Sequence, residues 1–312
     1  MATIPFRSDD TAGARSLNSR LLAYASRILA RIPPRTGSAI ANGLSWAHWA
    51  FFPSRRRAVV ANLRVMLPDA TPRERRRMTR RMMASYNRML FEFFQLPALP
   101  GARLLDTCEI TGLEHIARAR DAGRGVILTS SHIGNWELGA VALAHVGHRV
   151  HAVAGVQLSR WLSPAVRDAK QSLTVFTIAP EDGFRKLFRA LAGNDIVALM
   201  VDGGIFFQGA PVPFFGQLAS WPAGPGTLSK RTGAPVVCGY CERVAPGRFH
   251  VVLEPALDPE QFEDAHAINA AIAATTERHI REHLSQWCIF RPFWSPRSAA
   301  SAAEVQPGRV HA

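Results

Sequence analysis

Six apolar runs of strand length recur in the second part of the chain, and they constrain the fold more than any other feature. Helical stretches separate several of these runs, at 137–147, 163–171 and 182–193, and a last helix is expected at 265–285. Strands that alternate with helices form a largely parallel central sheet flanked by helices, so the sequence predicts an α/β fold. The runs are residues 125–129, 149–156, 174–179, 196–201, 235–240 and 249–254.

The pattern divides the chain into three predicted regions. Residues 1–100 are helical and basic, and Thr71 followed by Pro72 has the form of a helix start, with the threonine as N-cap. Two prolines precede the α/β core, which is predicted to span residues 101–298. Residues 299–312 are small and polar, which is typical of a disordered tail.

The basic character of the chain is confined to its first part. Residues 1–90 contain 17 arginines, no lysine and 4 acidic residues, so they hold the entire net charge of +13. A charge concentrated in this way indicates a polyanionic partner: an anionic membrane surface, an acidic protein or a nucleic acid.

A membrane surface fits the pattern of the first 57 residues. Apolar side chains recur at helical spacing from Leu17 to Ile32, arginines occupy other positions, and a pair of prolines follows. Tryptophans and phenylalanines then precede the arginine cluster 55–57. A basic amphipathic helix with adjacent aromatic residues is typical of a segment that lies on a bilayer.

The uncharged stretch 36–54 is too polar to predict a span, and no secretory signal is visible. The alternative is a solvated helix whose aromatic residues are core.

The four cysteines do not form a disulfide scaffold in a chain of this length. Cys238 and Cys241 form a lone C-x-x-C within a predicted strand, where a separation of three residues places the two thiols on opposite faces. Buried thiols in a reducing compartment are therefore favoured over a zinc or redox site.

The segment Ser-Ser-His-Ile-Gly-Asn-Trp-Glu, residues 130–137, carries the most chemistry. It follows a predicted strand, and the carboxyl ends of parallel strands are where open α/β sheets bind ligands. Asn135 is a candidate cap for the next helix, whose first turn would hold Glu137 close to His132. A carboxylate that fixes one ring nitrogen leaves the other free as a general base. The alternative is that His132 has no catalytic role and only caps a helix.

The chain has no G-x-S-x-G and no H-E-x-x-H motif, which disfavours a serine hydrolase and a zincin.

Several blocks together resemble the lipid A late acyltransferase family of the lysophospholipid acyltransferase superfamily. His132 to Glu137 is similar to the H-x-x-x-x-D/E motif of the superfamily in the form G-N-W-E. The resemblance covers about residues 17 to 297. The further matching blocks are 57–68, 200–203, 212–216, 222–226, 232–236 and the aromatic ending at 286–287 and 293–294.

The resemblance implies an O-acyltransferase with His132 as general base and Glu137 as the group that orients it. The donor would be an acyl carrier protein or acyl-coenzyme A, and the acceptor a hydroxyl of a lipid A precursor or related glycolipid. The alternative acceptor is a phosphatidylinositol mannoside, with acyl-coenzyme A as donor. Neither a metal nor another cofactor is expected. The implied place is the cytoplasmic face of the bacterial inner membrane, with the chain either peripheral or singly anchored.

The resemblance also supplies candidate substrate-binding residues. Members of the family usually carry an arginine in their second conserved block, followed a few residues later by a glycine. Arg167 is the nearest fit to that arginine, although the glycine is missing here, and Arg160 or Lys170 are alternatives. Asp202 ends an apolar run, and a charge is costly to bury without a role. The two phenylalanines and the glycine-proline turns are equally compatible with plain core and turn positions. The full set is Asn135, Arg167, Asp202, Phe214, Phe215, Gly216, Pro222 and Gly224.

A nucleic-acid-binding protein that uses the arginine-rich first part is the rival from another class. The arginines are interleaved with membrane-type aromatic residues, and no nucleic-acid-binding motif is recognisable, so nucleic acid is not an expected partner. A third possibility is an inactive membrane-surface scaffold of the same fold. The presence of both His132 and Glu137 disfavours it.

Overall fold

The central sheet is built from the predicted strands and one more. The computed structural model describes residues 17–99, 101–154, 166, 170, 171, 173, 175–178, 184–203 and 209–294. The tail at 299–312 and Arg167 lie outside these residues. The strands of the sheet are β1 (Cys108–Thr111), β2 (Val126–Ser130), β3 (Val150–Val153), β4 (Val175–Ile178), β5 (Ile196–Met200), β8 (Val236–Ala245) and β9 (Arg248–Leu253).

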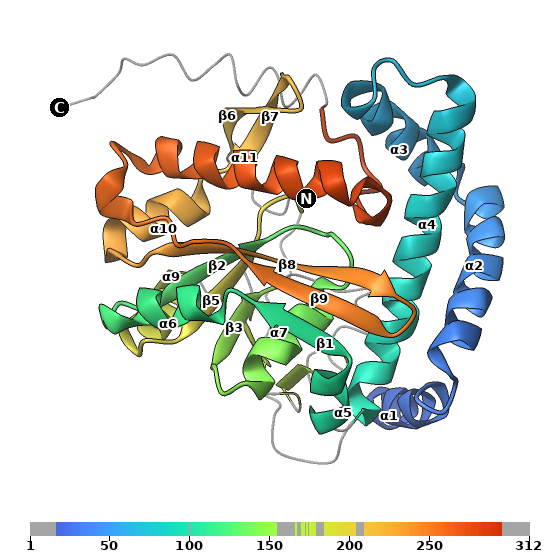
Figure 1. Cartoon of the computed structure of the whole chain (residues 1–312), viewed down its shortest axis with the longest axis horizontal. Coiled ribbons are helices and arrows are strands. Elements are labelled where there is room, and N and C mark those ends of the chain that lie inside the picture. The colour runs from blue at the N-terminus through green and yellow to red at the C-terminus, as the bar shows by residue number, and fades with distance from the viewer. Residues whose placement is uncertain are drawn as a thin grey trace, which may run out of the picture.

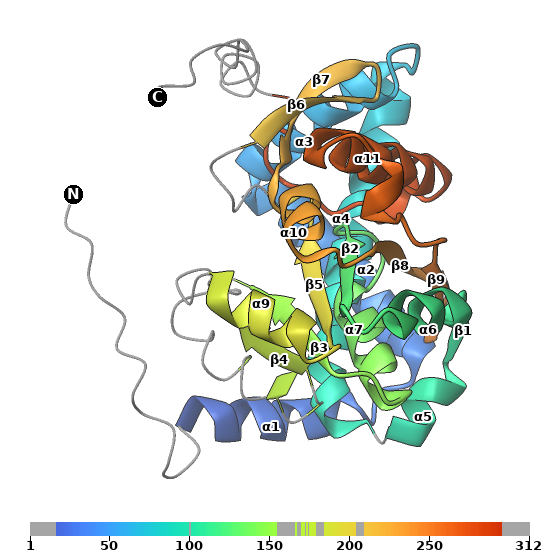
Figure 2. The ribbon, with the colours of Figure 1, turned by 90° about the vertical axis from the view of Figure 1, so that its left-hand side faces the viewer.

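The sheet has the strand order β1-β9-β8-β2-β5-β3-β4. All neighbours are parallel except β8 and β9, which form an antiparallel hairpin. The prediction of a largely parallel sheet is therefore confirmed, and β1 is an added strand that the apolar runs did not reveal. A separate antiparallel hairpin, β6 (Gly209–Phe214) with β7 (Gln217–Pro222), lies apart from the sheet (Figure 2).

Helices cover both faces of the sheet (Figure 1). One core lies against α9 (Phe184–Ala192), α10 (Gly224–Thr232) and α11 (Ala265–Glu282). The other core lies against α5 (Gly101–Asp106), α6 (Leu113–Asp121) and α7 (Trp136–His145). Successive residues of β2 alternate between the two cores, because side chains of a strand point to opposite faces.

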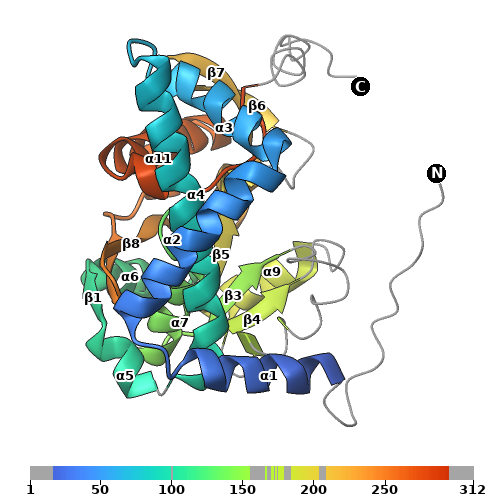
Figure 3. The ribbon, with the colours of Figure 1, turned by 90° about the vertical axis from the view of Figure 1, so that its right-hand side faces the viewer.

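The first part of the chain forms four helices, α1 (Leu17–Leu29), α2 (Pro34–Phe51), α3 (Pro53–Met66) and α4 (Pro72–Gln95). The stretch that is too polar for a membrane span lies almost wholly within α2. Thr71 caps α4 as predicted, in a reciprocal capping box with Glu74. Helices α1 and α2 both pack against α4 (Figure 3).

Helix α4 connects the helical region to the α/β core. Met82 near its middle belongs to the core under α11, whereas Met89 and Phe93 further along belong to the core under α7. The division of the chain at residue 100 stays a prediction, but α4 contributes side chains to both cores of the sheet. Among the described helices, none has both the length and the hydropathy needed to cross a bilayer.

The two cysteines of the C-x-x-C motif lie on opposite faces of β8, as the spacing predicts. Cys238 belongs to the core under α11 and Cys241 to the core under α7. Both thiols are buried and free. Burial raises the pKa of Cys238 to about 11, so this thiol is protonated at neutral pH.

A buried charged cluster joins α11 to the β8–β9 hairpin. His279 lies between two carboxylates, with Nδ1 3.2 Å from Glu242 Oε1 and Nε2 2.6 Å from Glu254 Oε1. Burial disfavours the charged imidazole, but these two bonds outweigh it and raise the pKa of His279 above 6.5. Burial also opposes the charge of Glu242, yet the bonds from His279 and His283 lower its pKa from 4.5 to about 2.

These shifts predict a pH window for the stability of the cluster. The raised pKa of His279 stabilises the fold below pH 6.5, and this contribution is lost as pH rises through the folded pKa. The lowered pKa of Glu242 stabilises the fold above pH 4.5, and this contribution is lost as pH falls toward about 2. Both contributions are present between pH 4.5 and pH 6.5. We therefore expect His279→Gln to lower Tm most in this range, as measured by thermal unfolding across pH. His266→Gln, on the exposed side of the same helix, is the matched control. A Tm difference that is independent of pH would contradict the prediction.

Candidate active site

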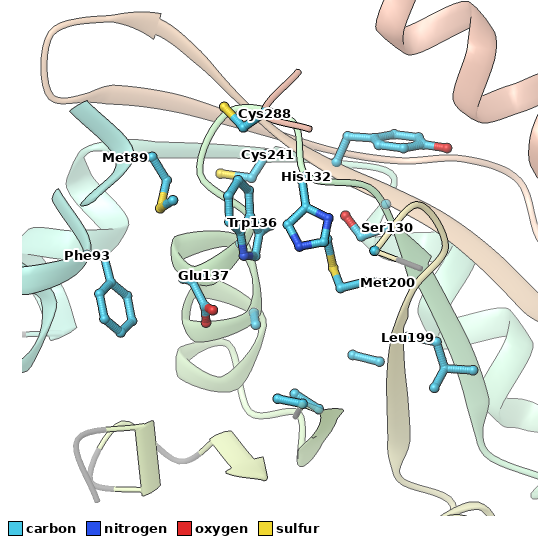
Figure 4. Close-up of a pocket in the computed structure, with 18 of the residues that line it drawn as sticks. Met89, Phe93, Ser130, His132, Trp136, Glu137, Leu199, Met200, Cys241 and Cys288 are labelled. Carbon is cyan, nitrogen blue, oxygen red and sulfur yellow. The ribbon is translucent and has the colours of Figure 1, made fainter. Parts of the chain in front are cut away.

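A tight loop at the carboxyl end of β2 carries the site. Gly134 has a φ of +60°, and a Cβ there would lie 2.0 Å from the carbonyl oxygen of Cys241, so only glycine fits. Asn135 caps α7 as predicted, because its Oδ1 accepts a hydrogen bond of 3.0 Å from the main-chain N–H of Leu138. The loop therefore holds His132 at a fixed place between a strand and a helix (Figure 4).

Asp202 is the carboxylate that contacts His132. Its Oδ1 lies 2.7 Å from His132 Nδ1, and its Oδ2 accepts from the main-chain N–H of His132 at 2.8 Å. Trp287 Nε1 also donates to Oδ2, at 2.8 Å. Burial alone would raise the pKa of Asp202, but the charge of His132 and these hydrogen bonds outweigh it and lower that pKa. The ionised carboxylate thus accepts a hydrogen bond from Nδ1–H of His132. This leaves Nε2 of the same ring without a proton and free to act as a base.

The C-terminal segment closes around Asp202. Besides the indole bond from Trp287, the guanidinium of Arg291 donates to the main-chain oxygen of Asp202 at 2.9 Å. Asn62 of α3 holds this segment in place, since its side chain donates to the main-chain oxygen of Arg291 and accepts from the main-chain N–H of Phe293. His132 and Trp287 therefore bring two distant parts of the chain to the carboxylate of Asp202, and Asn62 from a third part holds the C-terminal segment in place.

Glu137 does not have the partner that the sequence predicted. The spacing suggested a contact with His132, whereas Glu137 forms an ion pair with Lys170 at 2.6 Å. The reason is local: Glu137 lies in the first turn of α7 and its carboxylate turns toward Lys170, while Trp136 occupies the edge of the imidazole at a centroid distance of 4.7 Å. Both Glu137 and Lys170 are largely buried.

A second buried ion pair supports the loop from α4. Arg243 donates to Glu92 through Nε at 2.6 Å and through a terminal nitrogen at 2.5 Å. Asn135 Nδ2 donates to the same carboxylate at 3.0 Å. Neither member of this pair is among the site residues predicted from the sequence. The available signal was the inward-facing position of Arg243 on β8, two residues after the buried Cys241, because an arginine there needs a buried partner.

His132 faces an apolar cavity of about 540 Å³. Helix α4 supplies Met89 and Phe93 to its lining, α7 supplies Trp136, and strand β5 supplies Leu199 and Met200 (Figure 4). Glu137 and Lys170 add one buried charge of each sign. The cavity thus combines a mainly apolar lining with a free imidazole nitrogen at its wall.

The remaining predicted substrate-binding residues lie elsewhere. Phe214 and Phe215 belong to an aromatic cluster with Trp221, Phe293 and Trp294, in the core under α11. This is the core alternative that the sequence left open. Gly216 lies in the β6–β7 turn, Pro222 ends β7 and Gly224 begins α10. None of this set lines the cavity: Phe214, Phe215, Gly216, Pro222 and Gly224.

A metal centre has no candidate ligands in the part of the chain that the structure describes. No three His, Cys, Asp or Glu side chains there are grouped so that they could hold an ion.

Comparisons with known proteins identify the family of the chain. The model of the family described as bacterial lipid A biosynthesis acyltransferase matches residues 15–295. Phosphatidylinositol mannoside acyltransferase of Mycolicibacterium smegmatis is 30% identical over 220 residues, which cover 69% of this chain and 71% of that one. Lipid A biosynthesis lauroyltransferase of Escherichia coli is 24% identical over 275 residues, 86% of each chain.

One solved structure is also similar. The 1-acyl-sn-glycerophosphate acyltransferase PlsC of Thermotoga maritima matches 78% of this chain and 96% of its own, at 14% identity and a TM-score of 0.40. The family model spans nearly the whole chain, including both the His132 loop and the C-terminal segment that closes on Asp202. The chain belongs to the bacterial lipid A biosynthesis acyltransferase family, and it is an acyltransferase.

Proposed function

We propose that the protein transfers a fatty acyl chain from a thioester donor to a hydroxyl of a glycolipid, with His132 as general base. The observation that supports this most is the hydrogen bond between the buried carboxylate of Asp202 and His132, which lines a large apolar cavity. A chain of methylene groups gains roughly 0.8 kcal/mol for each group that it buries. The cavity gives an acyl chain such a place next to the base.

The proposed step balances without a cofactor. His132 Nε2 takes the proton of the acceptor hydroxyl, and the hydroxyl oxygen attacks the thioester carbonyl. The tetrahedral oxyanion collapses, the carbon–sulfur bond breaks, and the imidazolium returns its proton to the leaving thiolate. Asp202 stabilises the imidazolium that forms in between. The products are an ester and a free thiol.

Glu137 is proposed to act through Lys170 rather than through His132. The ammonium of Lys170 is the buried positive charge of the cavity wall, and Glu137 fixes its position at 2.6 Å. A fixed positive charge favours a reaction in which negative charge develops on the thioester oxygen. Lys170 was only an alternative for the second-block arginine in the sequence, and the structure gives it a partner.

The acceptor is proposed to be a lipid A precursor or a related glycolipid, and the relatives also fit the alternative of a phosphatidylinositol mannoside. The donor is acyl carrier protein or acyl-coenzyme A.

Mass spectrometry of the lipids of the source cell, with and without the gene, tests this proposal. The loss of one acyl chain from a glycolipid identifies the acceptor, and an unchanged glycolipid pool contradicts the proposal.

We propose that α1 and α2 lie on the cytoplasmic face of the bacterial inner membrane. Leu21, Tyr24 and Ile28 recur on one face of α1 and are each 45% to 66% exposed, which is unusual for apolar side chains so close together. On α2, Phe51 is 77% exposed. Arginines surround these residues, and an apolar stripe with basic flanks is suited to an anionic bilayer.

The first prediction concerns His132 and Asp202, the proposed catalytic dyad. His132→Ala should lower the transfer rate about 10²- to 10⁴-fold, because the base is lost while little apolar area is removed. Asp202→Asn should lower it less. Because the two groups act as a unit, the double variant should be no slower than His132→Ala alone. Thiol release from acyl-coenzyme A in the presence of acceptor lipid measures the rate. A double variant slowed by the product of the two single losses would contradict the dyad.

The second prediction concerns the buried ion pair. Lys170→Met should lower kcat about 10²- to 10³-fold if the ammonium stabilises the oxyanion. Glu137→Gln should lower kcat less than His132→Ala, because Glu137 positions the ammonium and does not take the proton. Lys230→Met removes an ammonium that lies outside the cavity and serves as control. Wild-type kcat in Lys170→Met would contradict the role.

The third prediction concerns the membrane surface. Replacing Leu21, Tyr24 and Ile28 together by serine should weaken flotation with anionic liposomes, since it removes exposed apolar area without emptying the core. High salt should weaken binding of the wild type as well. Leu218→Ser, at an exposed position on the β6–β7 hairpin, is the control. Equal flotation of the triple variant and the control would refute the proposed surface.

A further inference from the structure

Two arginines line the cavity together with His132. Arg55 comes from the first turn of α3, and Arg291 comes from the C-terminal segment that closes on Asp202. Phe290 lines the same cavity, and its ring lies 5.6 Å from that of His48. Neither guanidinium takes part in the proposed transfer step.

Arg55 is oriented by neutral groups. Its guanidinium lies 3.3 Å from His48 Nε2 and 4.9 Å from the centre of the Phe52 ring. His48 Nδ1 lies 3.3 Å from Asn87 Oδ1, so the imidazole donates to Asn87 and accepts from Arg55. Burial lowers the pKa of His48 and Arg55 lowers it further, against the bond to Asn87, which keeps this imidazole neutral. His48 therefore fixes the direction of Arg55 without neutralising its charge.

Arg291 is also held without a direct bond to a carboxylate. It donates to the main-chain oxygen of Asp202 and lies 5.3 Å from the centre of the Phe293 ring. The carboxylate of Asp202 is directed at His132 and Trp287, so it satisfies their donors and not those of Arg291. In the described part of the chain, neither Arg55 nor Arg291 forms an ion pair.

We propose that Arg55 and Arg291 form a subsite for a substrate phosphate at the cavity that holds His132. This inference rests on the proposed transfer reaction. A guanidinium presents several N–H donors in one plane, and two parallel donors match two oxygens of a phosphate. Both arginines keep donors free after the bonds described above. A phosphate bound there fixes the substrate beside the base.

The phosphate has two possible sources. The phosphopantetheine arm of a thioester donor carries one, and so does a phosphorylated lipid acceptor. Both sources share the same chemistry at the subsite, so the experiment compares each source with a matched molecule that lacks the phosphate.

The test measures binding with probes that cannot react. Hexadecyl-coenzyme A thioether and hexadecyl-pantetheine thioether form the donor pair, since only the first carries phosphates. Dioctanoyl phosphatidylinositol and dioctanoylglycerol form the acceptor pair. Affinities are measured by calorimetry for the wild type, Arg55→Gln, Arg291→Gln and a control, Arg56→Gln. Arg56 neighbours Arg55 in sequence but lies over Trp49, outside the cavity.

The phosphate-bearing member of one pair should bind the wild type more tightly than its partner. Arg55→Gln should weaken that binding about ten- to a hundredfold, the usual loss for a charged hydrogen bond, and leave the phosphate-free partner unchanged. Arg56→Gln should change neither. The pair that responds identifies donor or acceptor as the source. Equal losses for both members of a pair, or no loss in either pair, overturns the subsite. Because no acyl group moves, these results stand whether or not His132→Ala abolishes transfer.

Discussion

The buried carboxylate of Asp202 is the interaction on which the site depends. A charge in the interior is unfavourable unless several donors satisfy it, and here three donors do so: the imidazole and main-chain N–H of His132 and the indole of Trp287. These donors come from the end of β2 and from the last described segment of the chain. Correct packing of the C-terminal segment is therefore a condition for a correctly oriented base.

The same principle governs the second buried pair. Arg243 and Glu92 come from β8 and α4, and each would be unfavourable in the interior alone. Burial opposes the charge of Arg243, but Glu92 outweighs it and raises the pKa of the guanidinium. Because Glu92 also accepts from Asn135, the position of α4 is coupled to the start of α7. The helix that lines the cavity is thereby connected to the loop that carries His132.

The sequence predicted what depends on local pattern. Six strands, the cap at Thr71, the cap at Asn135 and the place of His132 at a strand end all follow from periodicity and from side-chain chemistry. It did not predict the partner of Glu137, because spacing along a helix does not give the direction of a carboxylate. Nor did it predict that Asp202 contacts His132, 70 residues away, or that Arg243 contacts Glu92, 151 residues away. Contacts at such separations are set by sheet order and helix packing, which a single sequence does not encode in any local pattern.

The cavity and the proposed membrane surface meet at the junction of α2 and α3. Phe51 and Phe52 are exposed there, and Arg55 lies within one helical turn of them on the cavity wall. The ring of Phe52 packs against His48, which orients Arg55. One short segment thus joins an exposed apolar edge to the charged part of the cavity. At the proposed membrane surface, a lipid acceptor would keep its chains in the bilayer while its headgroup reached the base, and the enzyme would not need to extract the lipid. The transfer of a headgroup alone exposes far less apolar area to water than the transfer of a whole lipid, and this difference favours a site that opens at the membrane.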